Sequence, residues 1–219
     1  MKNTKLHVKG IILDLDGTLV DSTQAYLEAA RTAFSAVGQQ TVSNKMAIEI
    51  PKRFEQGIPL DDLLRGVDVK KFRRIYLRAY YEAVGTMAKP FPDIANSLRK
   101  LSKKAKLALT TRRKVPNKVV IGQLKEFGLE GYFQAVVTAC DKFSPKPSPE
   151  ALVECSRKLG ISTSECAVVG DSIVDVEAGR RAGAKTVAVL SGIFSRDELK
   201  EQKPDLILAS VKELPDFLE

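Results

Sequence analysis

The chain has 219 residues, of which 44% are hydrophobic and 28% charged. This balance is typical of a globular protein and excludes a disordered chain, and no apolar run approaches the roughly 20 residues of a membrane-spanning helix. The formal net charge of +8 attracts anions such as phosphate esters and nucleic acids, although interspersed acidic residues leave no purely basic tail.

The cysteines and the first apolar run bear on the cellular compartment. Cys140, Cys155 and Cys166 are widely spaced, which predicts reduced and mostly buried thiols. Asp14 and Asp16 interrupt the first apolar run and no small-residue cleavage site follows, so we expect no signal peptide. These features predict a cytoplasmic protein.

The first predicted strand spans residues 6–14 and leads into two carboxylates. Residues 11–13 are an apolar run of the kind found in buried parallel strands, and Asp14 and Asp16 follow. Open α/β sheets bind ligands at this end of their strands. Two neighbouring carboxylates need a cation, and Mg²⁺ is the natural candidate because it prefers oxygen ligands. Gly17 lets the backbone turn sharply at this point.

The next stretch, to about residue 86, has a helical pattern throughout. Asp21 or Ser22 is expected to cap a helix that Gly38 ends, and Pro51 is expected to break or begin another. A short helix is predicted from Pro59 to residue 66, and an apolar stripe over 72–83 predicts a longer one. No convincing strand is expected between residues 20 and 105.

Strands and helices alternate in the rest of the chain. Short apolar runs predict strands at 106–110, 134–138, 166–169, 186–190 and 206–208. Helical segments separate them, with predicted starts near residues 93, 116, 148, 171, 195 and 210. This alternation predicts an α/β fold with a doubly wound (Rossmann-like) parallel sheet, interrupted after its first strand by a helical insert.

Four groups of polar residues fall at the strand ends or at a helix start: Asp14 with Asp16, Thr110, Lys146, and Asp171 with Asp175. With their neighbours, in segments 14–22, 146–149 and 170–175, they resemble the four motifs of the haloacid dehalogenase superfamily. The motif order and the helical insert are similar to its phosphoglycolate phosphatase/β-phosphoglucomutase-like branch. The resemblance implies an α/β catalytic core at 1–19 and 87–219 with a helical cap at 20–86 that closes over the site. It also implies that the first and fourth motif strands are neighbours, so that Asp14 and Asp171 face each other.

The resemblance also implies a role for each motif residue. Asp14, the backbone carbonyl of Asp16 and Asp171 would hold Mg²⁺, with Asp175 completing or orienting the shell. Asp14 would attack phosphorus and form an aspartyl phosphate, and Asp16 would act as general acid and then as general base.

The remaining two motif residues would serve the transferred group. Thr110 would donate a hydrogen bond to the phosphoryl oxygens, and Lys146 would supply a fixed positive charge to them.

The second motif departs from the branch, which commonly has Asn after the motif Thr or Ser. Here Thr111 keeps a hydroxyl donor but lacks the amide, so its ligand is in doubt. The basic run 112–114 follows directly, either as a solvated loop or with Arg112 reaching the anionic end of a substrate. In the cap, Lys45, Lys52 and Arg53 are either substrate-reading cations or a solvated helix face.

These features together predict a Mg²⁺-dependent phosphatase of small phosphorylated metabolites, with phosphoglycolate as the first candidate. The alternatives are a β-phosphoglucomutase-like phosphosugar mutase, and a non-catalytic nucleic-acid-binding or regulatory protein. A dehalogenase is disfavoured because Asp16 is present. We expect a small phosphorylated metabolite as partner, no membrane or nucleic acid, and a monomer or weak homodimer.

Overall fold

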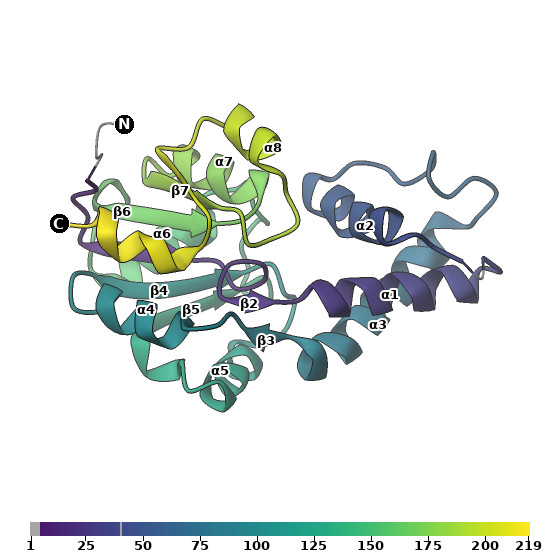
Figure 1. Ribbon diagram of the computed structural model, residues 1–219, viewed down its shortest axis with the longest axis horizontal. Helices are drawn as coiled ribbons and strands as arrows, with labels where there is room; N and C mark the ends of the chain where they lie inside the picture. Colours follow the sequence, from purple (N-terminus) through teal and green to yellow (C-terminus); the bar gives the residue numbers. More distant parts are fainter. Residues whose placement is uncertain (1–4, 40) are drawn as a thin grey trace. The chain divides into compact units, whose positions relative to one another are not determined.

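The computed structural model describes residues 5–39 and 41–219, which fold into two compact units. One unit comprises Met1–Val20 and Pro90–Glu219, and the other comprises Asp21–Lys89. Two short strands, β2 (Val20–Asp21) and β3 (Lys89–Pro90), pair where the chain passes between the units (Figure 1).

The larger unit is built on a six-stranded parallel sheet, as predicted. Its strands lie in the order β5-β4-β1-β6-β7-β8 (Figure 1). Their bounds are β1 Gly10–Leu13, β4 Lys106–Thr111, β5 Phe133–Thr138, β6 Cys166–Gly170, β7 Lys185–Val189 and β8 Leu206–Leu208. The order reverses direction at β1, because the chain first adds strands on one side of it and then on the other. Such a switch point is where open α/β sheets bind ligands.

Helices connect the parallel strands, and such connections are normally right-handed crossovers. Crossovers that run in opposite directions along the sheet place their helices on opposite faces. The helices are α4 Ile94–Leu101, α5 Asn117–Glu126, α6 Glu150–Leu159, α7 Ile173–Arg181 and α8 Arg196–Glu201. Three 3-10 turns add to them: η1 Glu130–Tyr132, η2 Thr163–Glu165 and η3 Val211–Phe217. The terminal helix predicted to start near Ser210 is thus present as a 3-10 helix that contains Pro215.

Strand β1 lies at the centre of the sheet, and its register positions the residues that follow it. All four of its residues are buried, and it pairs on one side with β4 and on the other with β6. Leu13 is opposite Val169 of β6, and the Asp14 backbone N–H donates to the Val169 carbonyl over 2.9 Å. The chain segments that follow β1 and β6 therefore leave the sheet next to each other.

The smaller unit is helical, as predicted, with α1 Thr23–Ala36, α2 Asn44–Gln56 and α3 Val69–Met87. The predicted apolar stripe on α3 packs against α1, where Phe34 and Phe72 meet edge to face with ring centroids 4.9 Å apart. Helix α1 begins after Ser22 without a side-chain cap from that residue, while the Asp21 carboxylate accepts from the Thr23 N–H.

The expectation of no strand between residues 20 and 105 is wrong, because β2 and β3 pair there. Two predictions for the helices of this unit are also wrong. Pro51 neither breaks nor begins a helix but lies inside α2, where burial of Pro51 and Ile50 offsets the lost backbone hydrogen bond. Residues 59–66 form turns instead of a short helix, because the Leu60 carbonyl closes a single turn with the N–H groups of Leu63 and Leu64.

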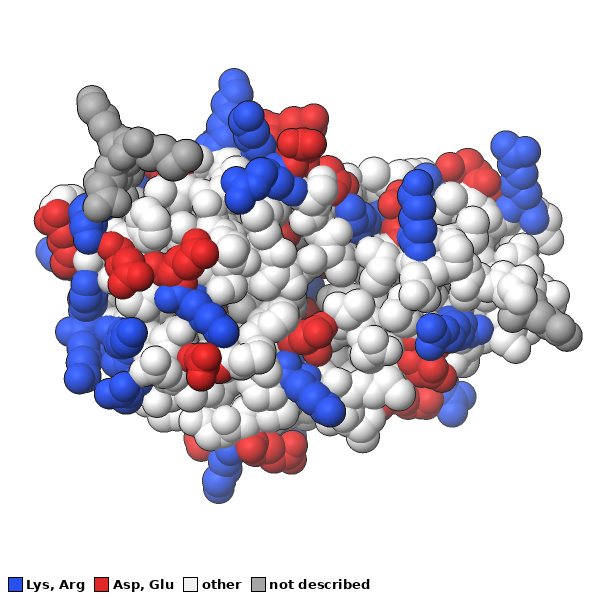
Figure 2. Space-filling view, in the orientation of Figure 1, with Lys and Arg blue, Asp and Glu red and all other residues white. Residues whose placement is uncertain are grey.

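The surface carries both signs of charge. On the face shown in Figure 2, Lys and Arg side chains stand beside Asp and Glu side chains. Cys155 and Cys166 are buried free thiols, and Cys140 is an exposed one. Across residues 5–39 and 41–219, no helix has the length and apolar character needed to cross a membrane.

Candidate active site

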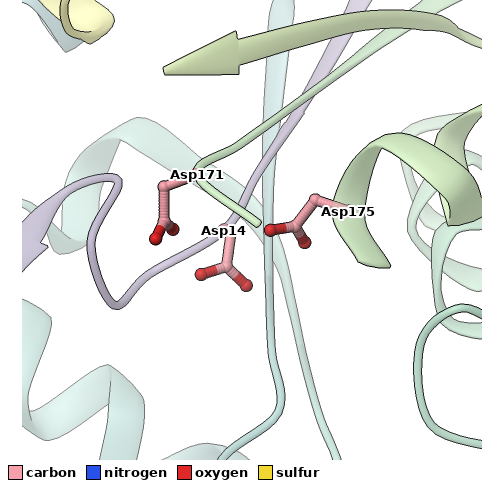
Figure 3. Close-up of side chains that lie close together, drawn as sticks. All are labelled: Asp14, Asp171 and Asp175. Atoms are coloured by element: carbon pink, nitrogen blue, oxygen red, sulfur yellow. The ribbon is translucent and has the colours of Figure 1, made fainter. Parts of the chain in front are cut away.

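Three buried carboxylates meet at the switch point of the sheet. Asp14 follows β1, Asp171 follows β6, and Asp175 lies in the first turn of α7. Each offers a carboxylate oxygen within 4.8 Å of those of the other two, and Figure 3 shows the three side chains converging. The structure therefore brings together acids that are about 160 residues apart in the sequence, as the first and fourth motifs predict.

Lys146 compensates part of this negative charge. Its Nζ donates to Asp14 Oδ1 over 2.6 Å and to Asp175 Oδ1 over 2.7 Å, and its side chain is 3% exposed. The residue lies in the loop before α6, where the sequence alone would also allow a solvated lysine. Its burial between two carboxylates instead makes it part of the site.

Burial and neighbouring charges shift the pKa values of Asp14 and Lys146 in opposite directions. Burial raises the pKa of the Asp14 carboxyl to about 7, with Lys146 opposing the rise and Asp175 adding to it. Burial alone would lower the pKa of Lys146, but the charges of Asp14 and Asp175 hold it above its usual value. Lys146 is therefore a permanent cation, while Asp14 without a metal holds its proton more tightly than an ordinary aspartate.

Hydrogen bonds, one of them from a distant part of the chain, fix the two acids that follow β6. Ser172 and Asp175 form a capping box at the start of α7, in which the Ser172 hydroxyl donates to Asp175 Oδ2 over 2.6 Å. Thr18 Oγ1 donates to Asp171 Oδ1 over 3.1 Å. Asp175 thus offers one oxygen to Lys146 and the other to the helix cap.

Two glycines make room for Asp171. A Cβ atom at Gly17 or at Gly192 would overlap the Asp171 carboxylate, so neither position accepts a side chain without displacing it. Gly17 also has φ +77°, a conformation that favours glycine. Ser191, next to Gly192, donates to the Gly17 carbonyl over 2.7 Å and joins the two loops.

Asp16 is held apart from the three acids by an arginine. Arg113 Nε donates to Asp16 Oδ2 over 2.7 Å, and its Nη2 donates to Asp16 Oδ1 over 2.6 Å. The Arg113 side chain is 6% exposed, so the prediction of a solvated basic loop is wrong at this position. The Asp16 side chain is not one of the three that could share a metal ion, so its predicted metal role rests on its backbone carbonyl.

The residues of the second motif line a pocket beside Lys146. Thr110 and Thr111, both buried, end β4, and the pocket also includes Arg112, which is half-buried. The Thr111 hydroxyl accepts from the Arg113 backbone N–H over 3.2 Å. The residues predicted to contact the phosphoryl group and the substrate thus line the same pocket as Lys146.

The chemistry of the acidic cluster fits a divalent cation. Three carboxylates meet beside one ammonium at one buried point, and the candidate ligand atoms are all oxygens. Hard divalent cations bind to such a set. Asp14, Asp171 and Asp175 would hold the ion, with Thr18 and Ser172 orienting two of these ligands.

Sequence reasoning left out several residues that build the site. Ser172 stands three residues before Asp175, the spacing of a capping box, so its orienting role could have been suggested. Thr18 gave no such signal for its contact with Asp171, 153 residues away. Arg113, Ser191 and Gly192 gave no such signal, because their contacts depend on how separate loops meet.

Comparisons with known proteins agree with this geometry. A family model described as haloacid dehalogenase-like hydrolase matches residues 11–189. The chain is 27% identical to pyrophosphatase PpaX of Halalkalibacterium halodurans (97% of this chain, 98% of that one) and 28% identical to a phosphoglycolate phosphatase of Aquifex aeolicus (95% and 96%). A solved haloacid dehalogenase-like hydrolase from Streptococcus pneumoniae superposes with a TM-score of 0.79 at 22% identity, covering 96% of this chain and 98% of that one, and shows the shared fold.

Proposed function

This chain belongs to the haloacid dehalogenase-like hydrolases, and from that premise we propose that it is a Mg²⁺-dependent phosphatase of small phosphorylated metabolites. The observation that carries the proposal is the convergence of Asp14, Asp171 and Asp175 on one point, with Lys146 bound to two of them. A phosphate ester repels a carboxylate nucleophile, so the site must neutralise charge before attack. The proposed ion would supply that neutralisation and polarise the phosphoryl oxygens.

The proposed reaction has two steps, both carried by aspartates. In the first, an oxygen of Asp14 bonds to phosphorus, the ester P–O bond breaks, and Asp16 gives its proton to the departing alkoxide. In the second, Asp16 takes a proton from water, whose oxygen bonds to phosphorus and releases inorganic phosphate and the Asp14 carboxylate. Lys146 and Thr110 would stabilise the charge on the phosphoryl oxygens in both steps.

The substrate class proposed is a small phosphate ester with a second anionic group, phosphoglycolate being the first candidate. Arg112 lines the pocket beside Thr110 and Lys146, where a cation would suit a carboxylate or a second phosphate. The two relatives named above bear the names of enzymes for phosphoglycolate and pyrophosphate, both of which carry two anionic groups. The helical unit remains the predicted cap.

A phosphatase screen tests this proposal. Purified protein would be assayed for phosphate release from phosphoglycolate, pyrophosphate, sugar phosphates and nucleotides, with Mg²⁺ or with EDTA. We expect release that requires Mg²⁺ and favours small substrates that carry a second anionic group beside the phosphate. Phosphoryl transfer between sugar positions without net phosphate release would instead indicate a mutase, and no turnover of any substrate would contradict an enzymatic role.

A further inference from the structure

Arg113 occupies an unusual place for the middle residue of a basic run. Although Arg112 and Lys114 flank it, its guanidinium is buried and makes a two-point contact with the Asp16 carboxylate. Such paired contacts fix the plane of a carboxylate as well as its position. The contact joins the loop after β4 to the loop after β1.

The guanidinium itself is held in place from the other side. Its Nη1 donates over 2.5 Å to Oε1 of Gln123, a residue of α5. The backbone of Arg113 is fixed as well, since its N–H donates to Thr111 and its carbonyl accepts from the Ala139 N–H over 3.2 Å. Arg113 is therefore oriented by β4, α5 and the loop after β5 before any substrate binds.

The charges of the site divide into two groups as a result. Asp14, Asp171 and Asp175 gather around Lys146, which contacts two of them, whereas Asp16 is held by Arg113. Asp16 and Gln123 together occupy both edges of the Arg113 guanidinium. These contacts suit a residue that holds Asp16 in place better than one that binds phosphate.

We propose that Arg113, held by Gln123, is the positioning residue for Asp16 in proton transfer to the leaving group. The inference rests on the proposed function, in which Asp16 protonates the departing oxygen. The proton is the one that Asp16 takes from water in the second step of the preceding turnover. Because its transfer requires a donor within hydrogen-bond reach of the departing oxygen, a protonated carboxyl group free to rotate would be a poorer acid than one fixed in plane and position.

A pair of substrates that differ in leaving group separates positioning from general structural support. 4-Nitrophenolate leaves readily without a proton, whereas the more basic phenolate depends more on an acid. We would measure kcat/KM with Mg²⁺ for 4-nitrophenyl phosphate and phenyl phosphate, since this parameter covers the steps up to leaving-group departure. The readout is the ratio of the two values.

Arg113→Met should raise that ratio about tenfold or more, in the direction that Asp16→Asn shows, because general acid catalysis contributes about 10²- to 10⁴-fold. Arg113→Lys, which keeps the charge but loses the paired contact, should give a smaller rise. Gln123→Leu should also raise the ratio, and it leaves Arg113 in place beside the Asp16 carboxylate. It is therefore the variant to measure if Arg113→Met fails to fold. Lys118→Met, an exposed residue at the start of α5, is the control and should leave the ratio unchanged.

The outcomes distinguish the two levels of the argument. If Asp16→Asn raises the ratio but Arg113→Met and Gln123→Leu lower both kcat/KM values equally or leave them unchanged, the positioning role is overturned and the proposed function stands. If Asp16→Asn itself leaves the ratio unchanged, Asp16 is not the acid, and both the proposed mechanism and the positioning role fail.

Discussion

Replacing Lys146 with methionine should destabilise the protein because it removes the cation shared by two buried acids. The Nζ atom lies 2.6 Å from Asp14 and 2.7 Å from Asp175, and all three side chains are nearly inaccessible to water. Methionine fills a similar volume but leaves both carboxylates without their cation. Breaking a buried ion pair in this way typically costs about 3–5 kcal/mol.

The magnitude can be measured as a shift in thermal midpoint in EDTA. For a chain of this length each kcal/mol corresponds to about 2–4 °C, so Lys146→Met should melt roughly 6–20 °C below the wild type. Added Mg²⁺ should reduce the difference, because a bound divalent cation compensates the same acids. Lys142→Met, an exposed residue in the same loop, is the matched control and should shift stability by less than about 0.5 kcal/mol.

The loss should also depend on pH. The pKa of Asp14 is about 7 with Lys146 present, and Lys146 lowers it, so the variant's Asp14 would hold its proton more tightly still. At pH 5 the carboxyl is protonated in both proteins, and the difference in midpoint should be smaller than at pH 8. Equal midpoints for Lys146→Met and wild type in EDTA at pH 8 would refute the reasoning.

Three further predictions concern the acidic cluster and its metal. Because burial raises the pKa of Asp14 to about 7, Mg²⁺ must displace a proton from this carboxyl below that pH. The Mg²⁺ affinity measured by calorimetry should therefore fall about tenfold per pH unit from pH 7 to 5. A Mg²⁺ affinity that does not change over that range would contradict this prediction. The raised pKa of Asp14 should also affect the free energy of unfolding in EDTA. This energy should fall as the pH rises from about 4 to 7, more than it does in Asp14→Asn, because the folded protein keeps the Asp14 proton to a higher pH than the unfolded chain. Ser172→Ala should lower stability by about 1 kcal/mol through the lost helix cap and weaken Mg²⁺ binding about tenfold by releasing Asp175. Ser195→Ala removes the equivalent capping box of α8, so it should lower stability by a similar amount but leave the Mg²⁺ affinity unchanged. Equal Mg²⁺ affinities for the two variants would count against an orienting role of Ser172.

Much of the site could be predicted because chain topology alone brings strand ends together. Asp14 and Asp171 each follow a short apolar run, and alternating strands and helices predict a parallel sheet whose carboxyl ends share one edge. The helix start at Ser195 was equally predictable, because the capping box found there depends on a local pattern of residue types. The parallel sheet and the meeting of Asp14 with Asp171, which follow from strand order, were therefore confirmed, whereas the local pattern at residues 59–66 predicted a helix wrongly.

Contacts between loops could not be predicted in the same way. Arg113 stands in a run that reads as solvated, and its burial depends on Asp16, 97 residues away, and on Gln123 of a neighbouring helix. Pro51 shows the opposite case, in which a strong local signal for a helix break yields to the burial of its neighbours within α2. In both cases tertiary packing, which one sequence does not display, decides the outcome.

Trapping the phosphorylated intermediate tests the central claim most directly. The protein would be mixed with Mg²⁺ and phosphoglycolate, or with the best substrate from the screen, quenched in acid within the first turnover, digested, and mapped by mass spectrometry. The account predicts a phosphoryl group on Asp14 that appears only with substrate and Mg²⁺ and is absent from Asp14→Asn, which should not turn over. Continued turnover by Asp14→Asn, or a phosphoryl group on another residue, would contradict it.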